Sequence, residues 1–252
     1  MLLKDKVAIV TGGAQGIGKA IAELFSREGA ELVLADKKID TLSKTAEEIS
    51  KNTARRCISV EADVSVKLQV DNLISRTVAE LGKIDILVNN AGIVLRKLIM
   101  DMSEQEWDRI MDINLKSCFL CSQAAAREMI KRKSGKIIYI SSCSAKKPTI
   151  FESAYSTTKA GMLGFNRVIA AELGPYGINC NAILPGATDT EMIRNTFLTS
   201  KEVEQEWIEK TALKRLGRPV DIARVALFLA SELSDHVTGE QIVVSAGEMM
   251  SQ

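Results

Sequence analysis

Apolar runs of strand length alternate along the chain with stretches of helical periodicity. Strands are predicted at residues 6–11, 31–36, 57–61, 84–88, 136–141, 178–184 and 241–244. Helices are predicted between the strands, at residues 39–51, 66–81, 153–173 and 220–230, with further helical segments before Gly29 and within residues 103–132. Strands that alternate with helices predict an α/β fold built on a single, doubly wound parallel sheet with helices on both faces.

One segment interrupts this alternation. Two short amphipathic helices are predicted at residues 189–196 and 200–211, between a strand and the final helix. An insertion beside the carboxyl ends of the strands can close over a bound molecule, so we predict that residues 187–215 form a substrate lid. No repeat, low-complexity run or linker divides the chain, and we expect residues 1–252 to form one domain.

Composition excludes several classes of function. The 252 residues carry a net charge of +1, which gives no reason to expect a nucleic-acid partner. The start of the chain lacks an apolar signal segment and no later run reaches membrane-spanning length, so we predict a cytoplasmic protein with no membrane partner. Cys118 and Cys121 have the spacing of a redox or metal pair. With one histidine, His236, and no second pair, we expect the two cysteines to pack inside a helix and expect no metal site.

A glycine turn joins the first predicted strand to the first helix. Its glycines allow a tight turn and let backbone N–H groups at a helix N-terminus approach a pyrophosphate. The order strand, glycine turn, helix, strand within about thirty residues is that of a Rossmann-like nucleotide-binding unit. The segment also nearly matches the Walker phosphate loop, but Ala20 replaces the hydroxyl residue that would bind magnesium, which argues against a nucleoside triphosphatase. The cofactor-binding residues expected here are Gly12, Gln15, Gly16, Ile17 and Gly18.

Asp36 ends the strand that follows the glycine turn and its helix. An acid at this position can accept hydrogen bonds from both hydroxyls of a ribose and repels a 2′-phosphate. We therefore predict NAD as the cofactor and disfavour NADP. Lys37 and Lys38 follow directly, and a lysine there could hold the extra phosphate.

Tyr155 and Lys159 lie four residues apart in a predicted helix, so their side chains share one face. A neighbouring cation favours the phenolate, and we expect Lys159 to lower the pKa of Tyr155 towards neutral pH, where the phenol could exchange a proton. Ser142 follows the predicted strand 136–141. Ligands of an open parallel sheet bind at the carboxyl ends of its strands, so we expect the Ser142 hydroxyl to meet Tyr155 in a site.

These motifs together resemble the short-chain dehydrogenase/reductase family, over essentially the whole chain. The resemblance implies that Tyr155 takes a proton from an alcohol as its hydride leaves to nicotinamide, while Lys159 binds the ribose and Ser142 binds the reacting oxygen. It implies that Asn114 positions a water in the proton relay. Further cofactor contacts implied by the family pattern are Asp63, Val64, Asn90, Ala91, Gly92, Tyr155, Lys159, Pro185, Gly186, Thr188 and Thr190.

The resemblance also implies a homotetramer in which the helices containing residues 120–129 and 160–171 pack across a two-fold axis. Two positions depart from the family pattern. Thr188 stands where an isoleucine or valine is usual after the Pro-Gly pair, and residues 244–247 stand near the usual Asp-Gly-Gly ending. Neither departure touches the four expected catalytic residues.

Three functions fit the sequence. The first is an NAD-dependent oxidoreductase that transfers a hydride between nicotinamide and a small-molecule secondary alcohol or ketone: a polyol, a sugar or another small hydroxylated metabolite. The second is an NADPH-dependent 3-oxoacyl thioester reductase acting on an acyl-carrier protein. The third is a non-catalytic NAD-binding regulator, which would have no need of Tyr155 and Lys159 together. Arg96 and Lys97 could meet an anionic substrate or could be solvated loop charges.

Overall fold

The computed structural model describes residues 1–250, which contain a seven-stranded sheet in which every strand is parallel to its neighbours. The strand order is β3-β2-β1-β4-β5-β6-β7, so the direction of winding reverses between β1 and β4. Such a reversal leaves a crevice at the carboxyl ends of the two strands. The strands are β1 (Val7–Thr11), β2 (Glu31–Asp36), β3 (Cys57–Glu61), β4 (Ile86–Asn89), β5 (Gly135–Ile140), β6 (Ile178–Pro185) and β7 (Gln241–Val244).

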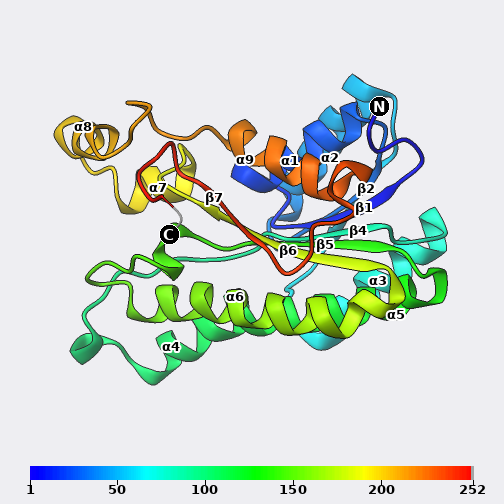
Figure 1. Ribbon diagram of the computed structural model, residues 1–252, viewed down its shortest axis with the longest axis horizontal. Helices are drawn as coiled ribbons and strands as arrows, with labels where there is room; N and C mark the ends of the chain where they lie inside the picture. The colour runs from blue at the N-terminus through cyan, green and yellow to red at the C-terminus, as the bar shows by residue number, and fades with distance from the viewer. Residues whose placement is uncertain (251–252) are drawn as a thin grey trace.

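Helices cover both faces of the sheet (Figure 1), which confirms the predicted doubly wound architecture. One layer consists of α1 (Gly16–Arg27), α2 (Ile39–Thr53) and α9 (Pro219–Ala230). The opposite layer consists of α3 (Lys67–Leu81), α4 (Glu104–Met111), α5 (Ser117–Arg132) and α6 (Ser153–Leu173).

Two apolar clusters fill the space between the sheet and its two helix layers. Successive residues of β1 point to opposite faces, so Ile9 packs with Leu73 in one cluster while Val10 packs with Phe25 in the other. A strand buried on both faces needs apolar residues at every position. This is why the strands are visible in the sequence as continuous apolar runs rather than as alternating patterns.

The predicted lid contains two short helices, α7 (Glu191–Thr196) and α8 (Lys201–Glu209), which lie beyond the carboxyl ends of the strands at the left of Figure 1. Each begins at a hydroxyl N-cap: the Thr190 side chain accepts a hydrogen bond from the N–H of Ile193, and Ser200 accepts one from Val203. The remaining short helical turns are η1 (Ile99–Asp101), η3 (Cys143–Ala145), η4 (Gly174–Tyr176) and η5 (Glu232–Ser234).

A five-residue π-helical segment, η2 (Asp112–Lys116), joins α4 to α5. The helical segments predicted within residues 103–132 therefore form a continuous helical stretch with one wide turn in the middle. A π turn changes the direction in which the following side chains project and is frequent at functional sites. Asn114 lies at the centre of this turn and is fully buried.

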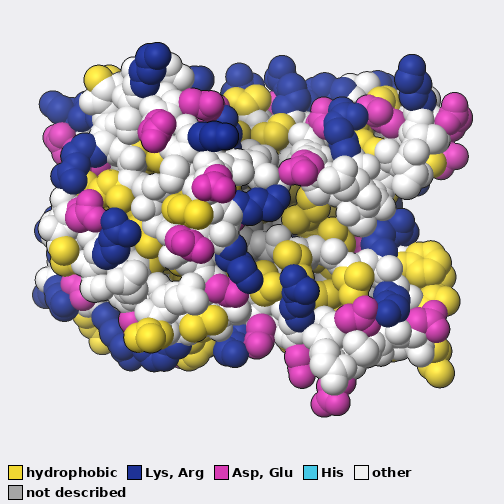
Figure 2. Space-filling view, turned by 180° about the vertical axis from the view of Figure 1, so that it is seen from behind, with side chains coloured by type: hydrophobic (Ala, Val, Ile, Leu, Met, Phe, Trp, Pro, Cys, Tyr) yellow, Lys and Arg dark blue, Asp and Glu magenta, His cyan; other side chains and the backbone are white. Residues whose placement is uncertain are grey.

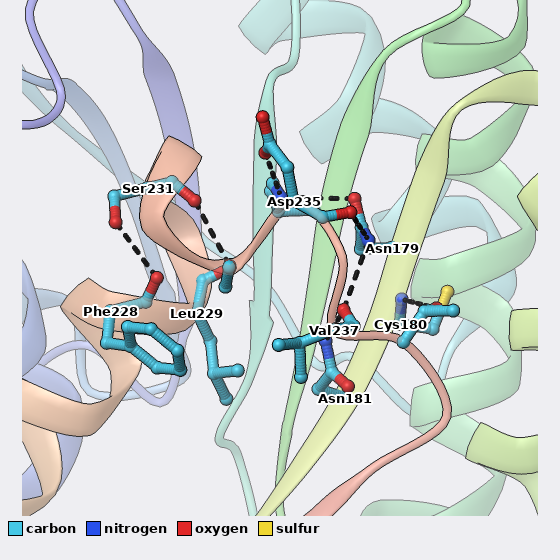
Figure 3. A network of polar contacts seen from close by, with 11 residues as sticks. Asn179, Cys180, Asn181, Phe228, Leu229, Ser231, Asp235 and Val237 are labelled. Carbon is cyan, nitrogen blue, oxygen red and sulfur yellow. Dashed lines mark hydrogen bonds and ion pairs between the residues drawn. The ribbon is translucent and has the colours of Figure 1, made fainter.

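The connection between α9 and β7 is fastened to the start of β6 by a polar network (Figure 3). The Asn179 amide donates to the carbonyls of Asp235 (3.0 Å) and Val237 (3.1 Å), and the Asn181 amide donates to Val237 (2.8 Å). Lys136 of β5 pairs with the Asp235 carboxylate at 2.7 Å. The network holds the amino ends of the strands together, at the edge of the sheet opposite the crevice.

No helix within residues 1–250 is both long enough and apolar enough to span a bilayer.

Candidate active site

A cleft of about 550 Å³ lies at the carboxyl ends of the strands. It brings together most of the residues that the sequence assigned to the site: Gly12, Gln15, Gly16, Ile17, Asp36, Asp63, Val64, Asn90, Ala91, Gly92, Ser142, Tyr155, Lys159, Pro185, Gly186, Thr188 and Thr190. Gly18 and Asn114 do not line it. Both lie one layer behind the cleft wall, where they position residues that do.

The glycine turn fits against the loop that follows β4. The side-chain amide of Asn90 donates to the carbonyls of Thr11 (2.9 Å) and Gly12 (3.0 Å), and the Thr11 hydroxyl accepts from the N–H groups of Asn90 and Ala91. A Cβ on Gly18 would lie 2.2 Å from the Gly12 carbonyl oxygen, so this position has room for glycine alone. The close fit fixes the two turns on either side of the crevice.

The N-terminus of α1 opens into the cleft with uncapped N–H groups. Gly16 begins the helix, and the N-cap residue Gln15 makes no side-chain capping bond. The first N–H groups of an α-helix have no partner within the helix, and the helix dipole adds a partial positive charge there. These groups, the glycine turn and Asp36 fit the pyrophosphate and ribose of a dinucleotide.

The end of the cleft where the sequence predicts adenosine to bind contains two carboxylates and two lysines. Asp36 accepts hydrogen bonds from the N–H groups of Ala14 (3.4 Å) and Lys38 (3.1 Å), which hold its carboxylate at the cleft wall. Lys37 pairs with Asp63 at 2.8 Å. Partial burial raises the pKa of Asp63, but hydrogen bonds from Lys37 and Ser65 outweigh it and leave the pKa lowered. Lys37 is thus engaged by an acid, whereas Lys38 is exposed beside Asp36.

The four expected catalytic residues come from three elements. Ser142 follows β5, Tyr155 and Lys159 come from α6, and Asn114 comes from the π turn. The Lys159 ammonium donates to the Ile140 carbonyl (2.8 Å) and lies 5.6 Å from the centre of the Tyr155 ring. Strand β5 therefore supplies the acceptor that orients the lysine, and it leads directly to the serine.

Asn114 is held by three hydrogen bonds. Its carbonyl oxygen accepts from the N–H of Ile93 (2.8 Å), and its amide donates to the Ile93 carbonyl (2.9 Å) and to the Thr158 hydroxyl (3.2 Å). A Cβ on Gly92 would lie 3.3 Å from the Asn114 oxygen and 3.6 Å from the Lys159 nitrogen. Asn114 therefore fixes the loop after β4 against α6, directly behind the lysine.

The pKa of Tyr155 changes in the direction opposite to our sequence-based expectation. Burial raises the pKa of this phenol to about 12, against the hydrogen bond from Ser142 that lowers it, and the negative charge of Glu152 raises it further. Burial also lowers the pKa of Lys159 to about 8. Because the Lys159 ammonium donates to a backbone carbonyl and sits over the ring, the residues of the chain do not by themselves favour the phenolate.

The nicotinamide-side loop closes the other end of the cleft. The Thr188 hydroxyl donates to the Gly186 carbonyl (3.0 Å), and Thr190 caps α7. Gln15 of the glycine turn donates to the Glu191 carboxylate (2.7 Å), which joins the turn directly to the lid. Thr188 uses its hydroxyl within the loop, so the departure from the family pattern is accommodated locally.

Several cleft residues were not anticipated from the sequence, among them Arg109, Ile113 and Met192. Ile113 directly precedes Asn114 in the sequence, and this position was the one signal that could have placed it at the cleft. Arg109 is on the exposed side of α4, and Met192 belongs to the lid; no periodicity distinguishes either from an ordinary surface residue.

The cysteine pair packs inside α5, as predicted. Cys118 and Cys121 are both buried with free thiols, and burial raises the pKa of Cys118 to about 11. Within residues 1–250 no cluster of three or more histidine, cysteine, aspartate or glutamate side chains has a geometry suited to a metal ion.

Comparison with known proteins agrees with the geometry. A family model described as enoyl-(acyl carrier protein) reductase matches residues 12–248. The chain is 38% identical over 246 residues to the 3-oxoacyl-[acyl-carrier-protein] reductase of Chlamydia muridarum, covering 98% of both chains. It is 36% identical over 245 residues to an NAD-dependent glycerol dehydrogenase of Listeria innocua, covering 97% of this chain and 94% of the relative.

A solved structure also superposes on nearly the whole chain. The crystal structure of levodione reductase has a TM-score of 0.95 at 30% sequence identity and covers 98% of both chains. The sequence matches, the parallel sheet and the cleft all indicate the same family. The chain belongs to the short-chain dehydrogenase/reductase family and is an oxidoreductase that acts on CH–OH groups.

Proposed function

We propose that the protein is an NAD-dependent dehydrogenase of a small secondary alcohol, a polyol, sugar or other hydroxylated metabolite. The observation that carries the proposal is the single cleft, which runs from the Asp36 carboxylate past the glycine turn to Ser142, Tyr155 and Lys159. One end recognises a ribose with free hydroxyls, and the other carries the proton-transfer groups. A dinucleotide lying along this cleft would present its nicotinamide to an alcohol bound at Tyr155.

The chain's residues would divide the chemistry among themselves. Nicotinamide, when bound, supplies the hydride acceptor. Tyr155 accepts the alcohol proton, Ser142 hydrogen-bonds the reacting oxygen, and Lys159 binds the nicotinamide ribose beside the phenol. Burial holds the pKa of Tyr155 at about 12 while the Lys159 ammonium donates to the Ile140 carbonyl, so the phenol would need further positive charge beside it, such as that of an oxidised nicotinamide, to act as a base near neutral pH. Asn114 holds the Ile93 backbone and would position a water behind Lys159.

The charges at the adenosine end support NAD over NADP. The Asp36 carboxylate lines the cleft and would repel a 2′-phosphate bound beside it, and Lys37 is already paired with Asp63 at 2.8 Å. Lys38 remains as the one neighbouring cation that could hold a phosphate. We expect Asp36→Ser to lower the ratio of kcat/KM for NAD to kcat/KM for NADP by at least about tenfold. An unchanged ratio would contradict this role of Asp36.

The second candidate is a 3-oxoacyl thioester reductase that uses NADPH. It is favoured by the identity of 38% to the reductase of that name from Chlamydia muridarum. The same cleft and the same tyrosine would serve this reaction, with the proton moving towards the substrate. The opposing observation is again Asp36, whose charge repels the phosphate that distinguishes NADPH.

The deciding experiment follows absorbance of the reduced nicotinamide with NAD and NADP across polyols, sugars, hydroxy acids and simple secondary alcohols, and with a 3-oxoacyl thioester in reverse. Turnover of an alcohol with NAD supports the proposal. Thioester reduction with NADPH and silence with every alcohol would favour the second candidate. Tyr155→Phe provides the control for the site: turnover should fall by about a thousandfold or more while NADH still binds. Near-normal turnover in that variant would remove Tyr155 from the mechanism.

We also propose a cytoplasmic homotetramer in which residues 1–252 act as one dinucleotide-binding and catalytic domain and residues 187–215 act as the substrate lid. Residues 251–252 lie outside the described residues. Support for the assembly comes from exposed apolar side chains on the two helices expected at the two-fold axis, Phe119 on α5 and Val168 on α6. The mass in solution tests it, and a monomer would contradict it.

A further inference from the structure

Three loops at the carboxyl edge of the sheet meet at a single arginine. Arg96 lies in the loop between β4 and η1, and its guanidinium carbon is 5.4 Å from the centre of the Phe151 ring and 4.9 Å from that of Phe197. Phe151 belongs to the loop between β5 and α6, and Phe197 is the C-cap residue of the lid helix α7. The arginine is therefore covered by one aromatic ring from each of two other loops.

The backbone holds this stack in place. The N–H of Lys97 donates to the Phe151 carbonyl at 2.8 Å, which ties the loop of Arg96 to the loop of Phe151. Phe151 has a φ of +75°, a left-handed conformation that is costly for a bulky residue. Phe197 packs edge-on against Trp207 of α8, with ring centres 6.2 Å apart. The two rings that flank the guanidinium are thus held by contacts of their own, and the loop of Phe151 carries local backbone strain.

The charge of Arg96 is not neutralised by the part of the chain that the structure describes. Its neighbour Lys97 pairs with Glu106 at 2.9 Å, and Arg194 in the lid pairs with Asp189. Arg96 makes neither a hydrogen bond nor an ion pair with any of residues 1–250. Contact with the two aromatic rings uses none of the N–H donors of the guanidinium, which remain available in the planar fork that matches a carboxylate.

The stack around Arg96 also lies near the residues proposed for proton transfer. Phe151 lies two residues before α6 begins at Ser153 and four residues before Tyr155 in the chain. Figure 2 shows this side of the molecule notched between the lobe that carries α7 and α8 and the lobe that carries η1 and α4. Arg96 precedes η1 in the chain, and Phe197 is the C-cap residue of α7. The cleft lining reaches both segments, at Ile93 and Ile193, so an anion bound by Arg96 would lie beside the cleft rather than within its lining.

We propose that Arg96 is a specificity-determining residue that binds the carboxylate of the substrate, and that the substrate is a small hydroxy acid rather than a neutral alcohol. The inference rests on the proposed function and narrows its substrate class. Phe151 and Phe197 position the guanidinium, and because Phe197 is attached to the lid, a bound carboxylate also favours the closed arrangement of the three loops. Arg96 is exposed, and its guanidinium can bind a carboxylate through charge-assisted, paired hydrogen bonds.

The test compares matched pairs of substrates on the full chain with NAD: gluconate against sorbitol, and 3-hydroxybutyrate against 2-butanol. Wild-type protein should prefer the acid in the pair that it turns over. Arg96→Gln should lower kcat/KM for the acid by about 10- to 100-fold and change that for the neutral partner by less than about threefold. Arg96→Lys should recover part of the loss, because it keeps the charge but not the fork. Lys97→Gln removes the neighbouring, already paired charge and should preserve the preference.

Each outcome decides the inference. Equal losses of kcat/KM for the acid and the neutral partner in Arg96→Gln would assign the stack a purely structural role. A wild-type preference for neutral alcohols would also overturn the inference, but it would leave the proposed function intact. NADH binding in each variant confirms that it folds. If no alcohol is turned over, the proposed function fails, and a binding measurement then tests the carboxylate site. In that case gluconate added with NADH must raise the melting temperature of the wild type and not that of Arg96→Gln. Equal or absent shifts would refute the carboxylate site.

Discussion

Replacing Lys159 by methionine tests whether the active site holds a buried charge at the expense of stability. Burial lowers the pKa of the Lys159 ammonium from 10.5 to about 8 in the folded chain. Below pH 8 the Lys159 amine is protonated in the folded and unfolded states alike, so its titration does not change the free energy of unfolding. Between pH 8 and 10.5 the unfolded chain still binds a proton that the folded chain has released, so the stability of the wild type rises with pH in this window.

The size of the effect follows from the two pKa values. The difference, 10.5 minus 8, is about 2.5 pH units, which corresponds to about 3 kcal/mol when the window is complete. By pH 9.5 the wild type should have gained about 2 kcal/mol relative to the Lys159→Met variant, which has no group to titrate there. At neutral pH two effects of the substitution oppose each other. It removes a buried charge, and it leaves the Ile140 carbonyl without the donor that now lies 2.8 Å away.

The assay is urea unfolding of both proteins between about pH 7 and pH 9.5, followed by tryptophan fluorescence, with the difference in unfolding free energy plotted against pH. Ionisations elsewhere in the chain cancel in that difference. Lys147→Met, which removes an exposed lysine from the loop after β5, provides the control and should give a difference that varies by less than about 0.5 kcal/mol. A flat difference for Lys159→Met would refute the depressed pKa and with it the view of Lys159 as a desolvated cation.

Two further predictions concern the residues behind the cleft wall. Gly18→Ala should weaken NADH binding by at least about tenfold in a fluorescence titration, because its Cβ would lie 2.2 Å from the Gly12 carbonyl oxygen. Gly164→Ala in α6, with no atom within 4 Å of the new Cβ, should raise the free energy of unfolding by about 0.5–1 kcal/mol. Equal NADH affinities of the two variants would contradict the steric argument for Gly18. Asn114→Ala should lower stability by about 2–4 kcal/mol, since both backbone groups of Ile93 lose their partner. A loss below about 1 kcal/mol in urea unfolding would show that water replaces the amide.

The fold could be predicted from the sequence because its strongest signals are local. Strands buried on both faces appear as unbroken apolar runs, and the Gly12-x-x-x-Gly16-x-Gly18 spacing with Asp36 marks one crossover of the sheet. Positions that follow a strand end, such as Ser142, could be placed at the cleft for the same reason. The bounds of the elements were less accurate: the strand expected at residues 84–88 is β4 at Ile86–Asn89.

Other features depend on packing between distant segments, and the sequence contains no sign of them. The π turn that aims Asn114 at Ile93 follows from how α4 and α5 meet α6. The direction of the Tyr155 pKa depends on how deeply the phenol is buried and on where the Lys159 ammonium finds its acceptor, and helical spacing alone suggested the opposite direction. The stack at Arg96 requires three loops that no periodicity relates to one another.

The hydrogen bond between Gln15 and Glu191 has a consequence for the timing of the catalytic cycle. It joins the glycine turn to the first turn of α7 across 2.7 Å, and the same short helix ends at Phe197. A dinucleotide bound along the glycine turn, as proposed, would compete with this contact, and a movement of Glu191 would be passed through α7 to Phe197. We therefore expect the cofactor to enter first and to leave last. The slow step of turnover would then be the opening of this contact as the reduced cofactor leaves, rather than the transfer of the hydride.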